Sequence, residues 1–189
     1  MGTLRAVPRL LGLDASKWAR VGPDSLWSAI VLVATASFVM ALNRFGGLIV
    51  DTPRSFLRLM LVGVWGWIGL AIAIWLVVRG TRTVQGDQAA AGPPPSLQVN
   101  VAAVGLAHTP VLALGIVIFV AAGLLEVLGP GFVAAIFVFG FWFPAGLIAA
   151  TAHVNRMAPV RAAVVVAVPY LIWMSIIGRH LLDRIQHLL

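Results

Sequence analysis

Several kinds of residue are scarce or missing in this chain, and each absence excludes a class of protein. The 189 residues contain no cysteine, which excludes disulfide bonds and any metal or redox site built on thiolates. Charged residues make up 10% of the chain, whereas average soluble domains contain ~25%. Lys17 is the single lysine, and the other basic residues are arginine. So little charge predicts a chain that folds in lipid rather than in water.

Recognisable catalytic motifs are also missing. The sequence contains no H-E-x-x-H pair for zinc, no phosphate-binding P-loop and no G-x-S-x-G nucleophile turn. Its six acidic residues form no carboxylate cluster. We therefore expect a protein that is not an enzyme, with no catalytic residues, cofactor or metal.

Apolar residues, in contrast, make up 61% of the chain and gather in five long runs. A helix of ~20 apolar residues crosses the ~30 Å hydrocarbon core of a bilayer. The alternation of a β-barrel is absent, so the runs predict an all-α bundle of five transmembrane helices with short connections. The predicted spans are residues 25–42, 56–78, 101–128, 132–152 and 160–177.

The remaining segments are too short to fold alone. Residues 1–24 are predicted to be a cytoplasmic tail, residues 25–178 the membrane domain and residues 179–189 an amphipathic C-terminal segment. This last segment either lies in the membrane interface or extends the fifth span, and both alternatives stay open. The first span also resembles a signal peptide around residues 34–37, but Asp14 and Asp24 in the long preceding region argue against cleavage.

Ionisable residues inside a membrane span are candidate functional groups. His108 lies in the third span directly before Thr109 and Pro110, Glu126 lies near the end of that span, and His153 closes the fourth. These five residues form the candidate intramembrane polar site. Each also has a structural explanation: the glutamate and His153 reach interfacial water, and His108 bonds a neighbouring helix in the bundle interior.

The last three spans each contain one proline, namely Pro110, Pro144 and Pro169. A proline inside a helix removes one hydrogen bond and frees the carbonyl four residues earlier. In these spans the freed carbonyls belong to residues 106, 140 and 165, and water or the Thr109 hydroxyl is expected to satisfy them. The kinks could also open a polar path through the bundle.

From residue 97 onward the sequence resembles the bacterial branch of the Yip1 domain family. The similarity rests on three segments: residues 105–110 (GLAHTP), residues 139–142 (FGFW) running on to 149–153 (AATAH), and residues 161–163 (RAA) before Pro169. This resemblance covers about half of the chain. It implies a five-helix membrane protein with a cytoplasmic N-terminus and a role in membrane organisation, and it supplies no catalytic residues.

Net charge is +7, which predicts attraction to anionic lipid head groups rather than to nucleic acid in so apolar a chain. We expect an inner (plasma) membrane protein of a bacterium. Its expected function is that of a scaffold, assembly factor or accessory subunit with membrane-protein partners. The alternative is a small transporter or channel module with a polar path lined by spans three to five. Gly63, Gly66 and Gly69 form a smooth strip that either meets a partner or packs internally.

Overall fold

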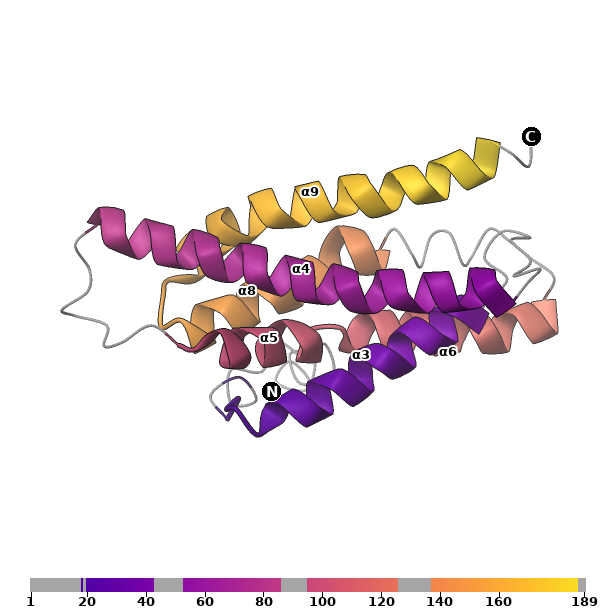
Figure 1. Cartoon of the computed structure of the whole chain (residues 1–189), viewed down its shortest axis with the longest axis horizontal. Coiled ribbons are helices and arrows are strands. Elements are labelled where there is room, and N and C mark those ends of the chain that lie inside the picture. The colour runs from indigo at the N-terminus through magenta and orange to yellow at the C-terminus, as the bar shows by residue number, and fades with distance from the viewer. Residues whose placement is uncertain (1–17, 19, 43–52, 86–94, 126–136, 187–189) are drawn as a thin grey trace, which may run out of the picture.

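The computed structural model describes residues 18, 20–42, 53–85, 95–125 and 137–186, and over these residues the chain is helical without any strand. The helices are α3 (Ser25–Leu42), α4 (Pro53–Gln85), α5 (Leu97–Leu106), α6 (Thr109–Leu125), the π-helix η2 (Val138–Trp142), α8 (Phe143–Val154) and α9 (Pro159–Gln186). Figure 1 shows α4 running along the long axis, with α9 on one side of it and α3 on the other. The all-α class is therefore confirmed.

Three helical stretches are long and apolar enough to cross a membrane: Phe56–Arg82, Leu97–Val117 and Pro159–Ile176. This indicates a membrane protein, as the composition predicts. The apolar helices at Ser25–Met40 and Val138–Val154 are shorter over the described residues. A bundle of five complete spans therefore stays a prediction.

The helix boundaries follow the apolar runs closely at the start of the chain and less closely later. Helix α3 has the bounds predicted for the first span, whereas α4 extends beyond residues 56–78 at both ends. Helix α9 continues without a break from Pro159 to Gln186, beyond the predicted end of the fifth span at residue 177. The predicted turn at residues 129–131 lies outside the described residues.

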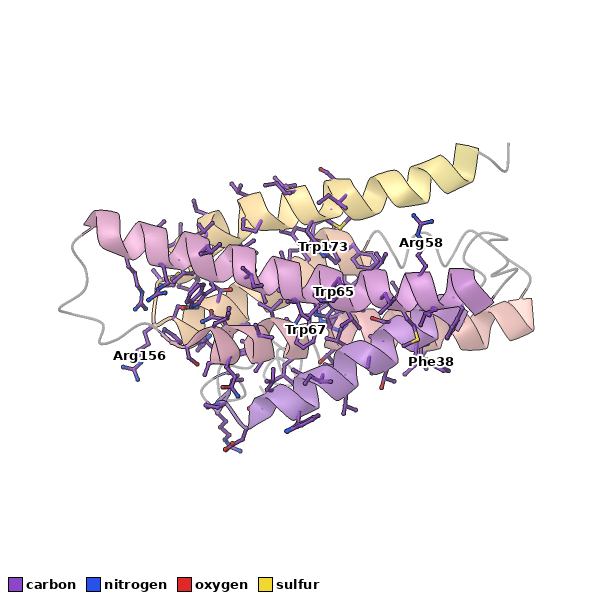
Figure 2. The ribbon with its side chains drawn as sticks, viewed as in Figure 1. Phe38, Arg58, Trp65, Trp67, Arg156 and Trp173 are labelled. Atoms are coloured by element: carbon purple, nitrogen blue, oxygen red, sulfur yellow. The ribbon has the colours of Figure 1, made fainter. Side chains whose placement is uncertain are left out.

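Small residues allow α3, α4 and α5 to approach one another closely. A Cβ atom on Gly105 of α5 would lie 2.6 Å from the Ala29 Cβ and 3.0 Å from the Trp67 ring. Only glycine fits there, because real Cβ atoms do not approach other carbons that closely. The Trp67 Nε1 also donates to the Val101 carbonyl oxygen at 3.0 Å, and Figure 2 shows this side chain between α4 and α5. Packing and hydrogen bonding therefore fix the same contact.

The glycine strip of α4 divides between two environments. Gly63 faces the Ser37 side chain of α3 and is an internal packing position. A Cβ atom on Gly69 would meet nothing within 4 Å. One end of the strip therefore packs internally, and the other lies open on the outer side of α4.

The third span is interrupted at its middle. Helix α5 ends at Leu106, α6 begins at Thr109, and the His108 N–H donates to the Gly105 oxygen, three residues earlier, at 3.0 Å. A proline two residues later explains the break, since Pro110 has no N–H to continue the α-helical ladder. The sequence predicts a kink here, and the structure shows two helices.

The segment of the predicted fourth span contains a different irregularity. The Phe143 N–H donates to the Val138 oxygen, five residues earlier, as in a π-helix. In that register the missing N–H of Pro144 falls opposite the Phe139 carbonyl, whereas the α register predicts the Gly140 carbonyl. The Tyr170 hydroxyl of α9 donates to the Phe139 oxygen. Tertiary structure therefore moves the freed carbonyl by one residue and supplies its donor.

Candidate functional site

His108 is buried at the break between α5 and α6. Its Nδ1 lies 2.8 Å from the Val104 carbonyl oxygen, and because a carbonyl only accepts, Nδ1 carries the proton. The Val104 oxygen needs this donor, because the His108 backbone N–H is directed to Gly105 instead. The predicted interior position is correct. The bond, however, runs to the preceding helix α5 of the same span rather than to a separate neighbouring span.

The His108 ring also contacts an aromatic ring of α8 in a T-shaped arrangement. The ring centroids of His108 and Phe143 are 4.7 Å apart at an interplanar angle of 63°. Phe143 is fully buried and also contacts Tyr170 and Trp173 of α9, at centroid distances of 5.8 and 5.7 Å. His108 is therefore one member of an aromatic cluster that joins α8, α9 and the break in the third span. This packing fixes its ring position.

Thr109 and Pro110 act together at the start of α6. The Thr109 Oγ1 donates to the Leu106 oxygen at 2.8 Å, and Leu106 is the residue whose carbonyl Pro110 leaves without a backbone donor. The Thr109 hydroxyl is thus the expected donor that the structure shows for the Leu106 carbonyl. The Thr109 side chain is exposed on the outer surface and Pro110 is buried. Both residues have a local structural role.

Of the other two candidates, the structure describes His153, which lies apart from the buried His108. His153 is exposed at the end of α8, and its Nδ1 bonds the Ala149 oxygen of its own helix at 2.9 Å. Glu126 lies outside the described residues. Among the residues that the structure describes, no group of three or more His, Asp or Glu side chains could hold a metal ion. The candidate residues therefore do not form one site in the described part of the chain.

Sequence reasoning missed a second set of buried polar side chains, which we call the polar junction: Arg82, Asn100, Thr151 and Asn155. They lie at the end of the bundle where α4 and α8 finish and α5 and α9 begin. The Asn155 Nδ2 donates to the Asn100 Oδ1 at 3.1 Å and to the Thr151 oxygen at 3.0 Å. The Asn100 Nδ2 donates to the Ser96 oxygen at 3.2 Å. The bond between Asn155 and Asn100 connects α5 to the end of α8.

Arg82 adds a positive charge to the polar junction. Its Nη2 donates to the backbone carbonyl oxygen of Asn155, the C-cap residue of α8. The C-terminal end of a helix carries partial negative charge, so a guanidinium there is favourable. Arg161, in the first turn of α9, similarly donates from Nη2 to the Thr81 oxygen at 3.4 Å. Each arginine thus supports the end of a helix other than its own.

The turn after α8 places one more arginine beside this junction. The Met157 N–H donates to the Ala152 oxygen at 2.9 Å, and Arg156 has a φ of 52°. This is the left-handed C-terminal cap that glycine usually provides. The Arg156 side chain is exposed, and Figure 2 shows it at the end of the molecule opposite to Arg58.

One signal in the sequence could have indicated the polar junction. Asn100 lies with Gln98 in the first turn of the otherwise apolar helix α5, and a polar side chain in such a place needs a partner. Its partner Asn155 is 55 residues away, in a segment that reads as an ordinary polar loop. No local pattern connects the two residues.

Comparison of the chain with family models, with curated proteins and with solved structures finds no match. The resemblance to the Yip1 domain family therefore stays a prediction. Its three segments lie in α5 and α6, in η2 and α8, and at the start of α9.

Proposed function

We propose that this protein is a non-enzymatic integral membrane scaffold, assembly factor or accessory subunit, similar to the Yip1 domain proteins. One observation carries the proposal: the buried polar groups are used to hold the bundle together. His108 bonds Val104 and packs on Phe143, and Arg82 and Asn100 bond to Asn155. Polar side chains that are hydrogen-bonded within the bundle support its packing, rather than a catalytic reaction or a pathway for solutes.

The outer faces of α4 and α9 support a role in association. Large apolar side chains are exposed along both helices: Leu61, Trp65, Ile72 and Leu76 on α4, and Val160, Val164, Leu171 and Ile176 on α9. In a membrane these faces meet lipid or other helices. Gly69 lies open on the same helix as Trp65 and would allow close approach of a partner helix.

We further propose that the protein lies in the inner (plasma) membrane of a bacterium with its N-terminus in the cytoplasm. On this orientation the inside carries eight basic residues and the outside five, as the positive-inside rule favours. The inside residues are 5, 9, 17, 20, 79, 82, 156 and 161, and the outside residues are 44, 54, 58, 179 and 184. An Ala90→Cys variant should react with an impermeant maleimide only after the cells are opened. Labelling of intact cells would reverse the orientation.

The second candidate is a small transporter or channel module. The break at residues 107–108 and the π-helix at Val138–Trp142 favour it, because interrupted helices often line transport sites. Thr109 and Pro110 lie at the first interruption and Phe143 directly follows the second.

Two measurements on the full-length protein separate these candidates. In proteoliposomes, a scaffold should leave proton, potassium and small-solute leakage equal to that of protein-free vesicles. In cells, a photo-crosslinking residue at Trp65 of α4 should give one adduct of defined mass. The same residue at Val117, which is exposed on α6 rather than on α4 or α9, serves as the matched control. A solute flux that His108→Leu abolishes, without a specific adduct from either position, would favour transport instead.

A further inference from the structure

We propose that Arg79, Arg82 and Arg156 form a binding site for the phosphate group of an anionic phospholipid. We call these three residues the arginine site. It lies at the end of the bundle where α4 and α8 finish, beside the polar junction. The proposal depends only on the chain being a membrane protein, and it holds whether the protein is a scaffold or a transport module.

The position of Arg79 and Arg82 along α4 is the first observation. The apolar stretch of α4 runs from Phe56 to Arg82, so Arg79 and Arg82 lie in its final turn, where lipid phosphates meet the hydrocarbon edge. The Arg79 Cζ lies 4.5 Å from the centroid of the Trp75 ring, and the Trp75 Nε1 donates to the Pro95 oxygen at 3.4 Å. A tryptophan anchored at this level holds the Arg79 guanidinium at the interface.

Charge is the second observation. The Arg82 side chain is 8% exposed, and its hydrogen bond goes to a neutral carbonyl oxygen rather than to a carboxylate. A buried charge needs an opposite charge nearby. Arg79, three residues earlier on the same helix, adds a like charge that repels it.

A phosphate at this place would offset both charges. Guanidinium groups bind phosphate through paired N–H donors, which gives them both strength and geometry. Arg82 bonds the backbone of Asn155, so the exposed Arg156 follows directly after the residue that Arg82 holds. The two exposed members of the arginine site, Arg79 and Arg156, can thus receive a head group from the bilayer surface, beside the buried charge of Arg82.

An apolar track beside the site favours a lipid over a soluble phosphate. Ile72 and Leu76 lie seven and three residues before Arg79, at spacings that place them on the same side of α4, and they are 37% and 56% exposed. An acyl chain can lie along these side chains while its phosphate meets Arg79. A soluble phosphate ester would make no use of this track.

The test is lipid binding to the full-length protein by native mass spectrometry in detergent. We expect phosphatidylglycerol to bind more tightly than phosphatidylcholine with the same acyl chains. The double variant Arg79→Gln/Arg156→Gln should weaken phosphatidylglycerol binding about 25-fold, or about fivefold for each arginine. Arg58→Gln is the matched control, because Arg58 is an exposed arginine at the other end of α4, and it should change binding less than twofold. Circular dichroism should show unchanged helix content in all variants, because the substituted side chains are exposed.

Three results would overturn the proposal. The first is an equal loss of binding in the Arg58→Gln variant, which would make the effect one of net charge. The second is equal affinity for phosphatidylcholine, which would remove the role of the anionic head group. The third is displacement of the lipid by an equal concentration of glycerol 3-phosphate, which would show that the site takes a soluble phosphate.

Discussion

Replacement of Tyr170 by phenylalanine removes one hydroxyl group and leaves the Phe139 carbonyl without its donor. In the π-helical register of Val138–Trp142, the backbone donor of this carbonyl would be residue 144, which is a proline. Tyr170 is 8% exposed, and its ring lies 5.8 Å from that of Phe143 and 5.9 Å from that of Trp173. A phenylalanine keeps these ring contacts, so the change isolates the hydrogen bond.

The expected loss of unfolding free energy is about 1–2 kcal/mol. A buried acceptor left without a partner costs about 1–3 kcal/mol, and measured side-chain hydrogen bonds within membranes are worth up to about 1.7 kcal/mol. Pro144→Ala should change this cost, because alanine returns an N–H to the position opposite Phe139. In the Pro144→Ala background, Tyr170→Phe should therefore cost less than half as much.

The measurement is reversible unfolding of the full-length protein by SDS in mixed micelles, carried out for all four members of this double-mutant cycle. Ser175→Ala is the control, because the Ser175 hydroxyl is exposed on the same helix and bonds the Leu171 oxygen at 2.8 Å. It should change stability by less than about 0.5 kcal/mol. A Tyr170→Phe cost no larger than that of the control would refute the role of the hydroxyl. An equal cost in both backgrounds would refute the role of Pro144.

Two further predictions concern the packing of the third span. Gly105→Ala should lower the unfolding free energy by about 1–3 kcal/mol, because the added Cβ would lie 2.6 Å from the Cβ of Ala29. The control, Gly69→Ala, places its Cβ in open space and should be neutral or slightly stabilising. Equal effects of the two variants in the same SDS titration would show that α3 and α5 do not approach as described. His108→Leu should cost about 1–2 kcal/mol because it leaves the Val104 oxygen without a donor, and His108→Asn should recover part of this loss, since an amide Nδ2 can replace the ring Nδ1. A leucine variant as stable as the wild type would show that this hydrogen bond contributes nothing.

Local sequence patterns predicted the parts of the fold that depend on neighbouring residues. The bounds of α3 follow from an apolar run, because a membrane helix forms all its backbone bonds within its own segment. The interruption near Pro110 and the bond from Thr109 to the Leu106 oxygen follow from the missing N–H of proline. The buried position of His108 follows from the cost of an unpaired polar group in lipid. Each of these inferences involves residues only a few positions apart.

Tertiary structure decided the features that join distant residues. Asn100 and Asn155 are 55 residues apart, and Arg82 and Asn155 are 73 apart, so no periodicity indicates that they meet. The freed carbonyl of the fourth span moved from Gly140 to Phe139 because the helix adopted a π register, and the hydroxyl of Tyr170, 31 residues later, supplies its donor. The sequence by itself thus determined a membrane protein made of apolar helices. Its composition indicates a lipid environment, and the length of its apolar runs indicates a helical backbone. Only the packed bundle decided which polar groups pair, because that choice depends on which helices are neighbours and on how each is rotated.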